Sequence, residues 1–373
     1  MEASQAAAAG IYSPDNFSGW VHRLDPFIIQ FTEHFGIRWY GMAYLTGFMV
    51  GYYLMVLIAR RGRNTLPEEQ LSDFVLAIVL GTMIGGRVGY AVFYSQDLLT
   101  DFSTSFPFWG VLRVWEGGMA SHGGILGIIL AAVYFAKTRK ANWLHLGDLT
   151  TLGGCVGIFA GRVANFINGE LYGRPVASSL SWAVKFPSEA YLWLKHDAEK
   201  SVTDLSPDLL PRLQDAVSRI GIASQDWLTW CSQVRTNLSA RNQIQHGIDR
   251  LIAATQESNS AVIDALEPVL TARHPSQLYE ALLEGALLFV ITFLFWRKPK
   301  KPGIVGGVWL TLYAIVRIIG EQFRMPDAHI GYQLFGLTRG QWISAGMIFV
   351  SLGILIYAIR KPGEQIGGWE KSS

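Results

Sequence analysis

Residues 39–59 read WYGMAYLTGFMVGYYLMVLIA, a stretch without a charged side chain that runs directly into Arg60. A helix that crosses a bilayer needs about 20 consecutive, mostly apolar residues, so this stretch predicts a transmembrane helix. The composition of the chain agrees, because half of its 373 residues are hydrophobic and only 16% are charged. Soluble domains carry roughly a quarter charged residues. The sequence therefore belongs to the membrane class.

The same criterion selects six further stretches, and together they predict an all-α membrane protein with seven transmembrane helices. Several stretches carry glycine at every fourth position, as at Gly81, Gly85 and Gly89. Small residues at that spacing share one helix face and let neighbouring backbones approach closely, which indicates a tightly packed bundle. The predicted spans are 39–59, 72–94, 118–136, 147–168, 276–296, 303–322 and 340–359.

Basic residues in the short loops predict the orientation, because cytoplasmic loops are enriched in lysine and arginine. Thirteen basic residues follow the odd-numbered spans, and the short segments on the other side hold five. We expect the side with thirteen to be cytoplasmic, with the N-terminus outside and the C-terminus inside. The thirteen are Arg60, Arg61, Arg63, Lys137, Arg139, Lys140, Arg297, Lys298, Lys300, Lys301, Arg360, Lys361 and Lys371, and the five are Arg23, Arg38, Arg113, Arg324 and Arg339.

This orientation divides the chain into five parts. We expect a periplasmic N-terminal segment in 1–38, transmembrane helices 1–4 in 39–174 and a periplasmic, mainly helical insert in 175–273. Transmembrane helices 5–7 follow in 274–362, and a cytoplasmic tail occupies 363–373.

Two of the periplasmic parts carry helical patterns. Residues 24–36, LDPFIIQFTEHFG, place Leu24, Phe27, Ile28, Phe31 and Phe35 on one helical face after Asp25-Pro26, which predicts a short interfacial helix. In the insert, apolar residues recur at helical spacing after a predicted cap at Ser224. These residues are Leu228, Cys231, Val234, Leu238, Ile248 and Leu251.

Charge and cysteine content exclude some other classes. A net charge of +2 provides no electrostatic footprint for nucleic acid. Cys155 lies in an apolar stretch and Cys231 in the polar insert, so we expect neither a disulfide framework nor a metal site built on cysteine.

Polar residues gather at one predicted depth, near the outer ends of six spans. At headgroup depth the available anion is a phospholipid phosphate, which the planar guanidinium of arginine matches with two parallel hydrogen bonds. Ionisable groups inside a membrane normally face an interior or a wet cavity. This layer therefore predicts a phospholipid-handling site. It contains Tyr40, Arg87, His122, Arg162, Asn165, the segment His274–Glu280, Tyr313, Arg317, Glu321 and Arg324.

Several of these residues, and three at or just after the end of the fourth span, also have a purely structural interpretation. Arg317 and Glu321 are compatible with an ion pair that fixes helix packing, and Arg87 with a side chain that binds backbone carbonyls. His122 is compatible with a hydrogen-bonded helix end, and Pro275 and Ser276 with a helix start. Asn168, Glu170 and Gly173 fit a tight turn. None of these interpretations explains why all the features share one depth.

Five motifs, in order, carry a resemblance to a known family. They are GGRVGYAVFY (85–94), WEGGMASHGGILG (115–127), GRVANFINGELYGR (161–174), RHPSQLYEALLEG (273–285) and RIIGEQFRMPD (317–327). Together they resemble the bacterial prolipoprotein diacylglyceryl transferases over roughly residues 37–175 and 271–362. The insert looks longer than in compact members, and Ala120-Ser121 replaces the Ser-Phe of some members before His122.

The resemblance implies transfer of a diacylglyceryl group from phosphatidylglycerol to the lipobox cysteine of a prolipoprotein signal peptide, the first step of bacterial lipoprotein maturation. The products would be a thioether and glycerol phosphate. The enzyme would be a multi-pass protein of the bacterial inner membrane, with its active site toward the periplasmic face. No cofactor and no metal are expected, and the partners would be these two substrates and the bilayer.

The resemblance also implies a set of functional residues. His122 is the candidate base for the cysteine thiol, which ionises near pH 8.5 when free. Arg162 and Arg317 would clamp the departing phosphate, Glu321 would hold Arg317, and Tyr40 would line the groove. The sequence alone does not single out the base. The expected contacts to phosphatidylglycerol are Arg162, Asn165, Glu170, Gly173, Tyr313, Arg317, Arg324 and Arg87.

Two other classes compete with this interpretation. A transporter or lipid scramblase predicts polar residues through the whole membrane depth, whereas the inner halves of the spans are nearly uncharged and Asp148 lies at the predicted cytoplasmic edge. An intramembrane protease needs a Ser/His or paired-Asp arrangement at one depth, and the sequence does not offer one.

Overall fold

The computed structural model describes residues 19–31, 36–61, 66–114, 117–176, 180–195, 207–326 and 332–370. Helices make up 67% of the structure and strands 7%, as a helical membrane protein requires. The chain divides into two compact units, which we describe separately. Unit 1 contains residues 1–43, 159–284 and 314–346, and unit 2 contains residues 44–158, 285–313 and 347–373.

Five helical segments of the described chain are long and apolar enough to cross a membrane. Two further apolar helices are shorter, α5 (Ser121–Thr138) and α14 (Ile304–Gly320). All seven fall on the stretches selected from the sequence, although the length criterion itself supports five. The long ones are α2 (Trp39–Ala59), α3 (Leu71–Phe93), α6 (Trp143–Ile167), α15 (Arg339–Arg360) and the run Ser276–Phe295, which comprises α12 (Ser276–Glu280), a π-helical segment (Ala281–Leu287) and α13 (Leu288–Phe295).

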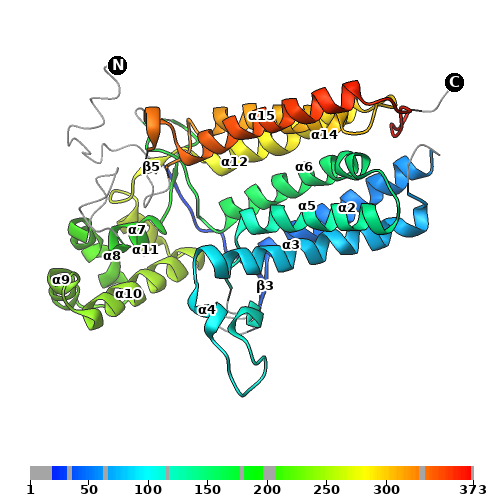
Figure 1. Cartoon of the computed structure of the whole chain (residues 1–373). Coiled ribbons are helices and arrows are strands. Elements are labelled where there is room, and N and C mark those ends of the chain that lie inside the picture. Colours follow the sequence, from blue (N-terminus) through cyan, green and yellow to red (C-terminus); the bar gives the residue numbers. More distant parts are fainter. Residues whose placement is uncertain are drawn as a thin grey trace. The chain divides into compact units, whose positions relative to one another are not determined.

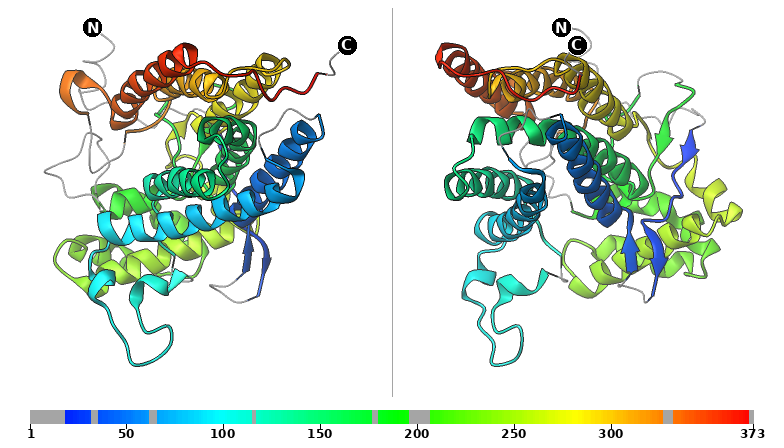
Figure 2. Two further views of the ribbon diagram at one scale, coloured as in Figure 1. Left: turned by 45° about the vertical axis from the view of Figure 1, so that its right-hand side comes forward. Right: turned by 90° about the vertical axis from the view of Figure 1, so that its right-hand side faces the viewer.

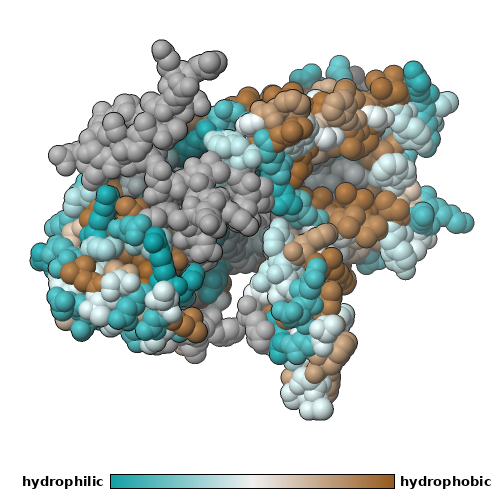
Figure 3. Space-filling model, turned by 60° about the vertical axis from the view of Figure 1, so that its left-hand side comes forward, coloured by the Kyte–Doolittle hydropathy of each residue, from teal (hydrophilic) through white to brown (hydrophobic). Residues whose placement is uncertain are grey.

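The helices of unit 2 expose apolar side chains that a soluble protein would bury. Met49 is 62% exposed and Phe349 is 75% exposed. Brown, apolar side chains cover much of the helical surface visible in Figure 3. Contiguous apolar patches of this size mark membrane or protein contact, so the helices are those of a multi-pass membrane protein.

Glycines join α3 to α5 in unit 2, and the two helices run side by side in Figures 1 and 2. A Cβ atom added at Gly81 would lie 2.6 Å from the carbonyl oxygen of Gly127, and one at Gly89 would lie 2.7 Å from the Cα of Gly123. The backbones therefore touch where side chains would stand, which confirms the close packing predicted from the glycine spacing.

Asp148 explains where α14 begins. Its carboxylate accepts hydrogen bonds from the backbone N–H groups of Gly303 at 2.8 Å and Gly306 at 2.6 Å. The first N–H groups of a helix lack partners within the helix, and a carboxylate there also interacts favourably with the helix dipole. Outside the insert, the described chain also has the short helix α4 (Asp97–Thr100) and the 3₁₀ turns Glu68–Gln70, Gly110–Leu112 and Leu334–Gly336.

The described residues of the insert form mainly helices and belong to unit 1. Its core surrounds Trp227, which is fully buried and donates its indole N–H to the carbonyl of Leu210 at 2.9 Å. The helices lie together in green and yellow-green in Figure 1. They are α7 (Glu189–Lys195), the 3₁₀ segment Pro207–Leu213, α8 (Gln214–Arg219), α9 (Ser224–Gln233), α10 (Leu238–Gln256) and α11 (Ser260–Leu266).

The predicted cap at Ser224 is wrong. Ala223 occupies the N-cap position of α9, and no side chain caps that helix. The side-chain cap belongs to the next helix, where Asn237 accepts hydrogen bonds from the N–H groups of Ser239 and Ala240. Of the apolar residues used to predict these helices, Leu238 is 73% exposed because it is the first residue of α10 and precedes the buried face.

A small sheet joins the N-terminal segment to both ends of the insert. Strand β1 (Trp20–Val21) pairs in parallel with β4 (Val184–Lys185), which pairs antiparallel with β5 (Ala272–Arg273). Arg273 and Glu189 form a buried double ion pair beside it, at 3.0 and 2.9 Å. This pair anchors helix α7 next to the chain segment that leads into α12.

The predicted interfacial helix over residues 24–36 is wrong. The chain forms a hairpin instead, with β2 (Phe27–Gln30) antiparallel to β3 (Gly36–Arg38). Ile29 pairs with Ile37, and the Arg38 guanidinium lies 4.4 Å from the centre of the Phe27 ring. Cross-strand pairs of β-branched and aromatic side chains stabilise strands more than helices. Phe35 lies outside the described residues.

Candidate functional site

Three arginines and three glutamates of unit 1 form one cluster. Arg317 contacts all three glutamates: Nη1 lies 2.5 Å from Glu280 Oε1 and 3.0 Å from Glu284 Oε1, and Nη2 lies 2.5 Å from Glu321 Oε1. Arg162 contacts the same two glutamates of the fifth predicted span, Glu280 at 3.0 Å and Glu284 at 3.1 Å. Arg324 approaches Glu280 to 3.7 Å. The cluster therefore joins residues of α6, α12, the π-helical segment and α14.

The carboxylates lie beneath the guanidiniums. The side chains of Glu280 and Glu284 are 0% exposed, and that of Glu321 is 5% exposed. Arg162, Arg317 and Arg324 keep between 13% and 16% of their side-chain surface exposed. Each guanidinium has five N–H donors, so carboxylates hold it from the buried side while part of it stays accessible. Such an arrangement can receive an anion.

Glu321 is fixed from a second direction. Thr338 Oγ1 donates a hydrogen bond to Glu321 Oε2 at 2.8 Å. Thr338 and Gln341 also cap α15 reciprocally, since each side chain accepts the other's backbone N–H. Gly340 leaves room for the carboxylate, because a Cβ there would lie 2.6 Å from Glu321 Cδ. The start of α15 thereby fixes the glutamate that holds Arg317.

Tyr40, Asn165 and Glu170 form a second polar group in unit 1. The Tyr40 hydroxyl donates to Glu170 Oε1 and accepts from Asn165 Nδ2. Asn165 also donates to Glu170 Oε1 at 3.0 Å. Asn165 lies three residues after Arg162 on α6, which places both on one face of that helix. The structure thus brings together three side chains that the sequence predicted as site residues.

The turn that carries Glu170 is held from the start of α12. Leu171 adopts a positive φ of 54°, a strained conformation for a residue with a side chain. Gln277 Nε2 donates to the carbonyl of Glu170 at 2.7 Å, and Ser276 Oγ donates to that of Leu171 at 3.3 Å. The structural interpretation of HPSQLYE as a helix start is confirmed, because Pro275 occupies the N-cap position of α12.

Gly173 lies where three chain segments meet. Its N–H donates to the carbonyl of His274 at 3.0 Å, and it forms a β-bridge with Arg324. A Cβ at this position would lie 2.6 Å from the carbonyl oxygen of Phe323. Only glycine fits this crossing, so its structural role is to bring the GELYGR turn against the end of α14 and the HPSQ segment.

Arg87 of unit 2 uses all its donors on backbone. Nε donates to the carbonyl of Val111 at 2.7 Å, and the remaining nitrogens donate to four further carbonyls. Five hydrogen bonds match the five N–H groups of a guanidinium, and the residue is only 4% exposed. This geometry supports the structural interpretation of Arg87. The other four carbonyls belong to Gly110, Arg113, Gly117 and Gly118.

Two further predicted residues also belong to unit 2. His122 is exposed in the first turn of α5. The Tyr313 ring stacks on Trp309 of the same helix, with 5.4 Å between ring centres. A second histidine belongs to unit 1: His274 contacts the rings of Tyr279 and Phe323, and burial lowers its pKa.

Sequence reasoning missed several residues that carry this geometry. The sequence does not single out Glu284, and it places Glu280 in the polar layer only as the end of the segment His274–Glu280. The four-residue spacing between them was a signal, since such residues share a helix face, but helical spacing alone does not reveal which arginines they meet. Thr338 and Gln341 have the spacing of a capping box before an apolar run, which indicates a helix start but not the contact of Thr338 with Glu321. The buried pair Arg273–Glu189 gives no comparable signal.

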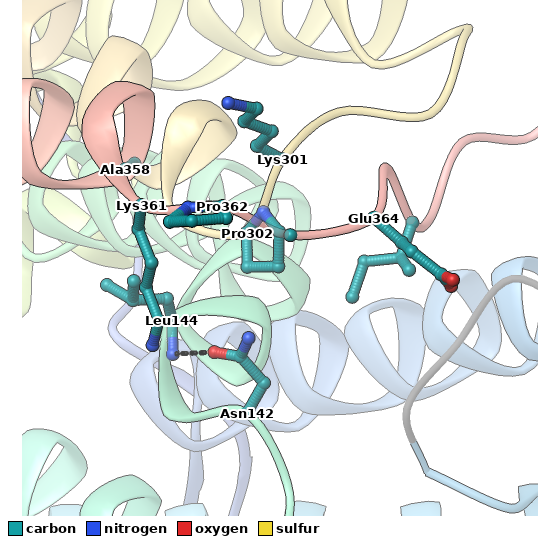
Figure 4. Close-up of a pocket in the computed structure, with 10 residues that line it drawn as sticks. Asn142, Leu144, Lys301, Pro302, Ala358, Lys361, Pro362 and Glu364 are labelled. Carbon is teal, nitrogen blue, oxygen red and sulfur yellow. Dashed lines mark hydrogen bonds between the residues drawn. The ribbon is translucent and has the colours of Figure 1, made fainter.

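The described residues hold no group of metal ligands, and one cavity among them lies in unit 2. Within the described part of the chain, no group of three or more His, Cys, Asp or Glu side chains is placed to hold a metal ion. A cavity of about 230 Å³ lies in unit 2, where Asn142 accepts a hydrogen bond from the Leu144 N–H (Figure 4). Lys301 and Lys361 also line it, but none of the predicted site residues does.

Comparison with known proteins identifies the family. A family model described as prolipoprotein diacylglyceryl transferase matches residues 26–357. The chain belongs to this family. Membership of a transferase family decides against the two competing function classes, a transporter and an intramembrane protease. The transferase resembles its relatives over nearly its whole length.

Relatives from three bacteria carry the name phosphatidylglycerol–prolipoprotein diacylglyceryl transferase. The protein of Bdellovibrio bacteriovorus is 43% identical over 351 residues, which cover 94% of this chain and 97% of the relative. That of Paramagnetospirillum magneticum is 31% identical, covering 91% and 95%. That of Paraburkholderia xenovorans is 34% identical, covering 87% and 90%. The alignment with the Bdellovibrio bacteriovorus protein leaves only 6% of this chain unmatched, which is much less than the length of the insert (175–273). The alignment therefore includes most of the insert.

Proposed function

We propose that the transferase moves the diacylglyceryl group of phosphatidylglycerol to the thiol of a lipobox cysteine in a prolipoprotein signal peptide. The sulfur forms a bond to the glycerol carbon that carries the phosphate ester, and the bond from that carbon to the phosphate oxygen breaks. A thioether and glycerol phosphate result, and the thiol proton passes to a base. The accessible arginine cluster over buried glutamates supports this proposal most directly.

Leaving-group stabilisation is the first chemical requirement. The phosphate oxygen gains negative charge as the carbon–oxygen bond breaks, and preorganised donors in a water-poor site stabilise such charge strongly. Arg162, Arg317 and Arg324 would receive the phosphate on their exposed sides. Glu321 would keep Arg317 oriented, since it contacts Nη2 and is itself held by Thr338.

Headgroup orientation is the second requirement. Tyr40, Asn165 and Glu170 present hydroxyl, amide and carboxylate groups that match the hydroxyls of a glycerol headgroup. Gly173 would act by placing this turn, and Tyr313 would line the groove. We assign Arg87 to holding its loop, because its N–H groups already meet five carbonyls.

Thiol activation is the third requirement. His122 is the proposed base, because its imidazole is exposed in the first turn of α5 and histidine is the side chain that most often acts as a general base. A His122→Gln variant should lose transfer while still binding phosphatidylglycerol. Near-normal turnover in that variant, together with a loss in His274→Gln, would reassign the role to His274.

The proposal includes a topology. Seven helices would cross the bacterial inner membrane, with the N-terminus outside and the C-terminus in the cytoplasm. The excess of basic residues after the odd-numbered spans supports this orientation. The site would then open to the periplasm, where the insert and the N-terminal segment also lie.

A direct assay tests the reaction. The purified protein is incubated with a lipobox peptide in vesicles that contain phosphatidylglycerol, and the peptide is examined by mass spectrometry. We expect a diacylglyceryl mass gain on cysteine and release of glycerol phosphate. A peptide whose cysteine is replaced by serine and vesicles of phosphatidylethanolamine alone are the controls. An unmodified cysteine despite a folded protein would refute the proposal.

A further inference from the structure

Glu280 and Glu284 have no evident place in substrate binding. Both side chains are 0% exposed, so neither reaches a ligand, yet both contact Arg162 and Arg317. Burying a carboxylate costs several kcal/mol unless it is paired. The ion pairs of both glutamates are made with the arginines of the cluster. The two glutamates therefore act through those arginines.

The backbone is irregular at this pair. Residues Ala281–Leu287 form a π-helical segment that begins directly after Glu280 and contains Glu284. Such segments are rare and occur often at functional sites. The extra residue per turn changes the direction in which Glu284 points relative to a regular helix. Here it lets both carboxylates meet Arg162, one at Nη1 and the other at Nη2.

The charges of the cluster balance. Three guanidiniums face three carboxylates, and Glu280 alone contacts all three arginines. Three unopposed arginines would hold a phosphate very tightly, and more tightly still once cleavage turns the singly charged diester into a doubly charged monoester. A transferase must release that product to turn over.

We infer that Glu280 and Glu284 are positioning residues which also lower the affinity of the arginine cluster for phosphate, so that the released glycerol phosphate leaves. The inference rests on the proposed function, because it takes the arginine cluster as the phosphate site. It assigns the buried carboxylates a role in product release in addition to holding the arginines. Their negative charge offsets the attraction that would otherwise retain the product.

Glu284→Gln tests this inference. It keeps the shape of the side chain and removes its charge. We expect the dissociation constant of glycerol phosphate, measured by calorimetry on the purified protein, to fall about tenfold, as expected for losing one nearby charge in a partly screened site. Product inhibition of transfer should strengthen by a similar factor. Glu284→Asp retains the charge and should bind glycerol phosphate within about twofold of the wild-type protein.

Glu189→Gln is the matched control. It also removes a buried carboxylate from an arginine pair in unit 1, but one outside the cluster. It should lower thermal stability and leave the affinity for glycerol phosphate unchanged. Unchanged or weaker binding in Glu284→Gln would overturn the inference. The proposed function would stand in that case, provided the wild-type protein still transfers diacylglycerol.

Two further measurements keep the inference open to refutation if Glu284→Gln does not fold. Glu280→Gln removes the other carboxylate of the pair and should also tighten binding about tenfold. The wild-type protein supplies the last measurement, since a charge-balanced cluster should bind glycerol phosphate or inorganic phosphate only with a millimolar dissociation constant. A micromolar or tighter constant would contradict the inference.

Discussion

Arg317 and Glu284 form an ion pair between two helices, with 3.0 Å between Nη1 and Oε1. They are 33 positions apart in the sequence, and the same arginine holds Glu280 and Glu321. One guanidinium therefore links the fifth and sixth apolar segments at the site. This arrangement uses the fork of arginine, which a lysine cannot reproduce.

Arg317→Lys should reduce transfer at least about a hundredfold, because a single ammonium cannot contact three carboxylates and a phosphate in fixed directions. The measurement is kcat/KM for a lipobox peptide in phosphatidylglycerol vesicles. The melting temperature is recorded alongside, to separate misfolding from lost chemistry. Activity near that of the wild-type protein would mean that Arg317 supplies charge alone.

Tyr40→Phe should lower kcat/KM about tenfold, which corresponds to roughly 1.4 kcal/mol, since it removes the hydroxyl that joins Asn165 to Glu170. Tyr53→Phe is the control, because Tyr53 lies on the same helix and is 64% exposed. It should behave as the wild-type enzyme does. Equal activity of both variants would remove Tyr40 from the site.

Arg87→Lys should destabilise the protein by a few kcal/mol, since an ammonium has three donors for five carbonyls and leaves some of them unpaired. We expect a lower melting temperature with an unchanged KM for phosphatidylglycerol in the fraction that stays folded. A KM raised severalfold at an unchanged melting temperature would show instead that Arg87 contacts the lipid.

Gly127→Ala should destabilise unit 2 by about 1–3 kcal/mol, because the added Cβ would meet the carbonyl of Gly81 and force α3 and α5 apart. Gly147→Ala is the matched control, since no atom lies within 4 Å of the Cβ built there. That change should leave stability equal or slightly higher. Thermal unfolding in detergent measures both. A Gly127→Ala protein as stable as the control would refute the close packing.

His22 should make stability depend on pH. Burial lowers its pKa from 6.5 to about 4, although its ring hydrogen-bonds to the carbonyl of Phe166. Between these values the unfolded chain binds a proton that the folded chain does not. The free energy of unfolding should therefore be highest above pH 6.5 and fall by up to about 3 kcal/mol as the pH drops toward 4.

Melting temperatures between pH 4.5 and 7.5 test this dependence. His22→Phe keeps a ring for the contacts with Phe166 and Phe186 and removes the titrating group. It should flatten the pH profile by that amount. A wild-type profile that does not change across this range would contradict the prediction.

Local patterns in the sequence determined the helices. Stretches such as 39–59 are apolar over a full bilayer thickness, and any chain with that pattern must form helices in lipid, where each backbone N–H and C=O has to be paired internally. Glycine spacing determined the face on which α3 meets α5, because a contact of backbones requires missing side chains. The ordered motifs determined the family.

Local patterns failed where distant segments decide the structure. The FIIQ segment became a strand because Gly36–Arg38 pairs with it, and helical periodicity in one segment does not reveal such a partner. The sequence left Arg87 open between a headgroup contact and a structural role, and only the tertiary structure shows that its guanidinium donates to five backbone carbonyls.

The cluster around Arg317 shows most clearly what the sequence determines and what only the tertiary structure determines. From the sequence, Arg317 and Glu321 are a pair four residues apart on one helix, equally compatible with packing and with chemistry. Only the tertiary structure brings Glu280, Glu284 and Arg162 to the same place, through a π-helical segment that no periodicity indicates. The role of a charged side chain such as Arg317 depends on the charged side chains that contact it, and these belong to distant parts of the sequence.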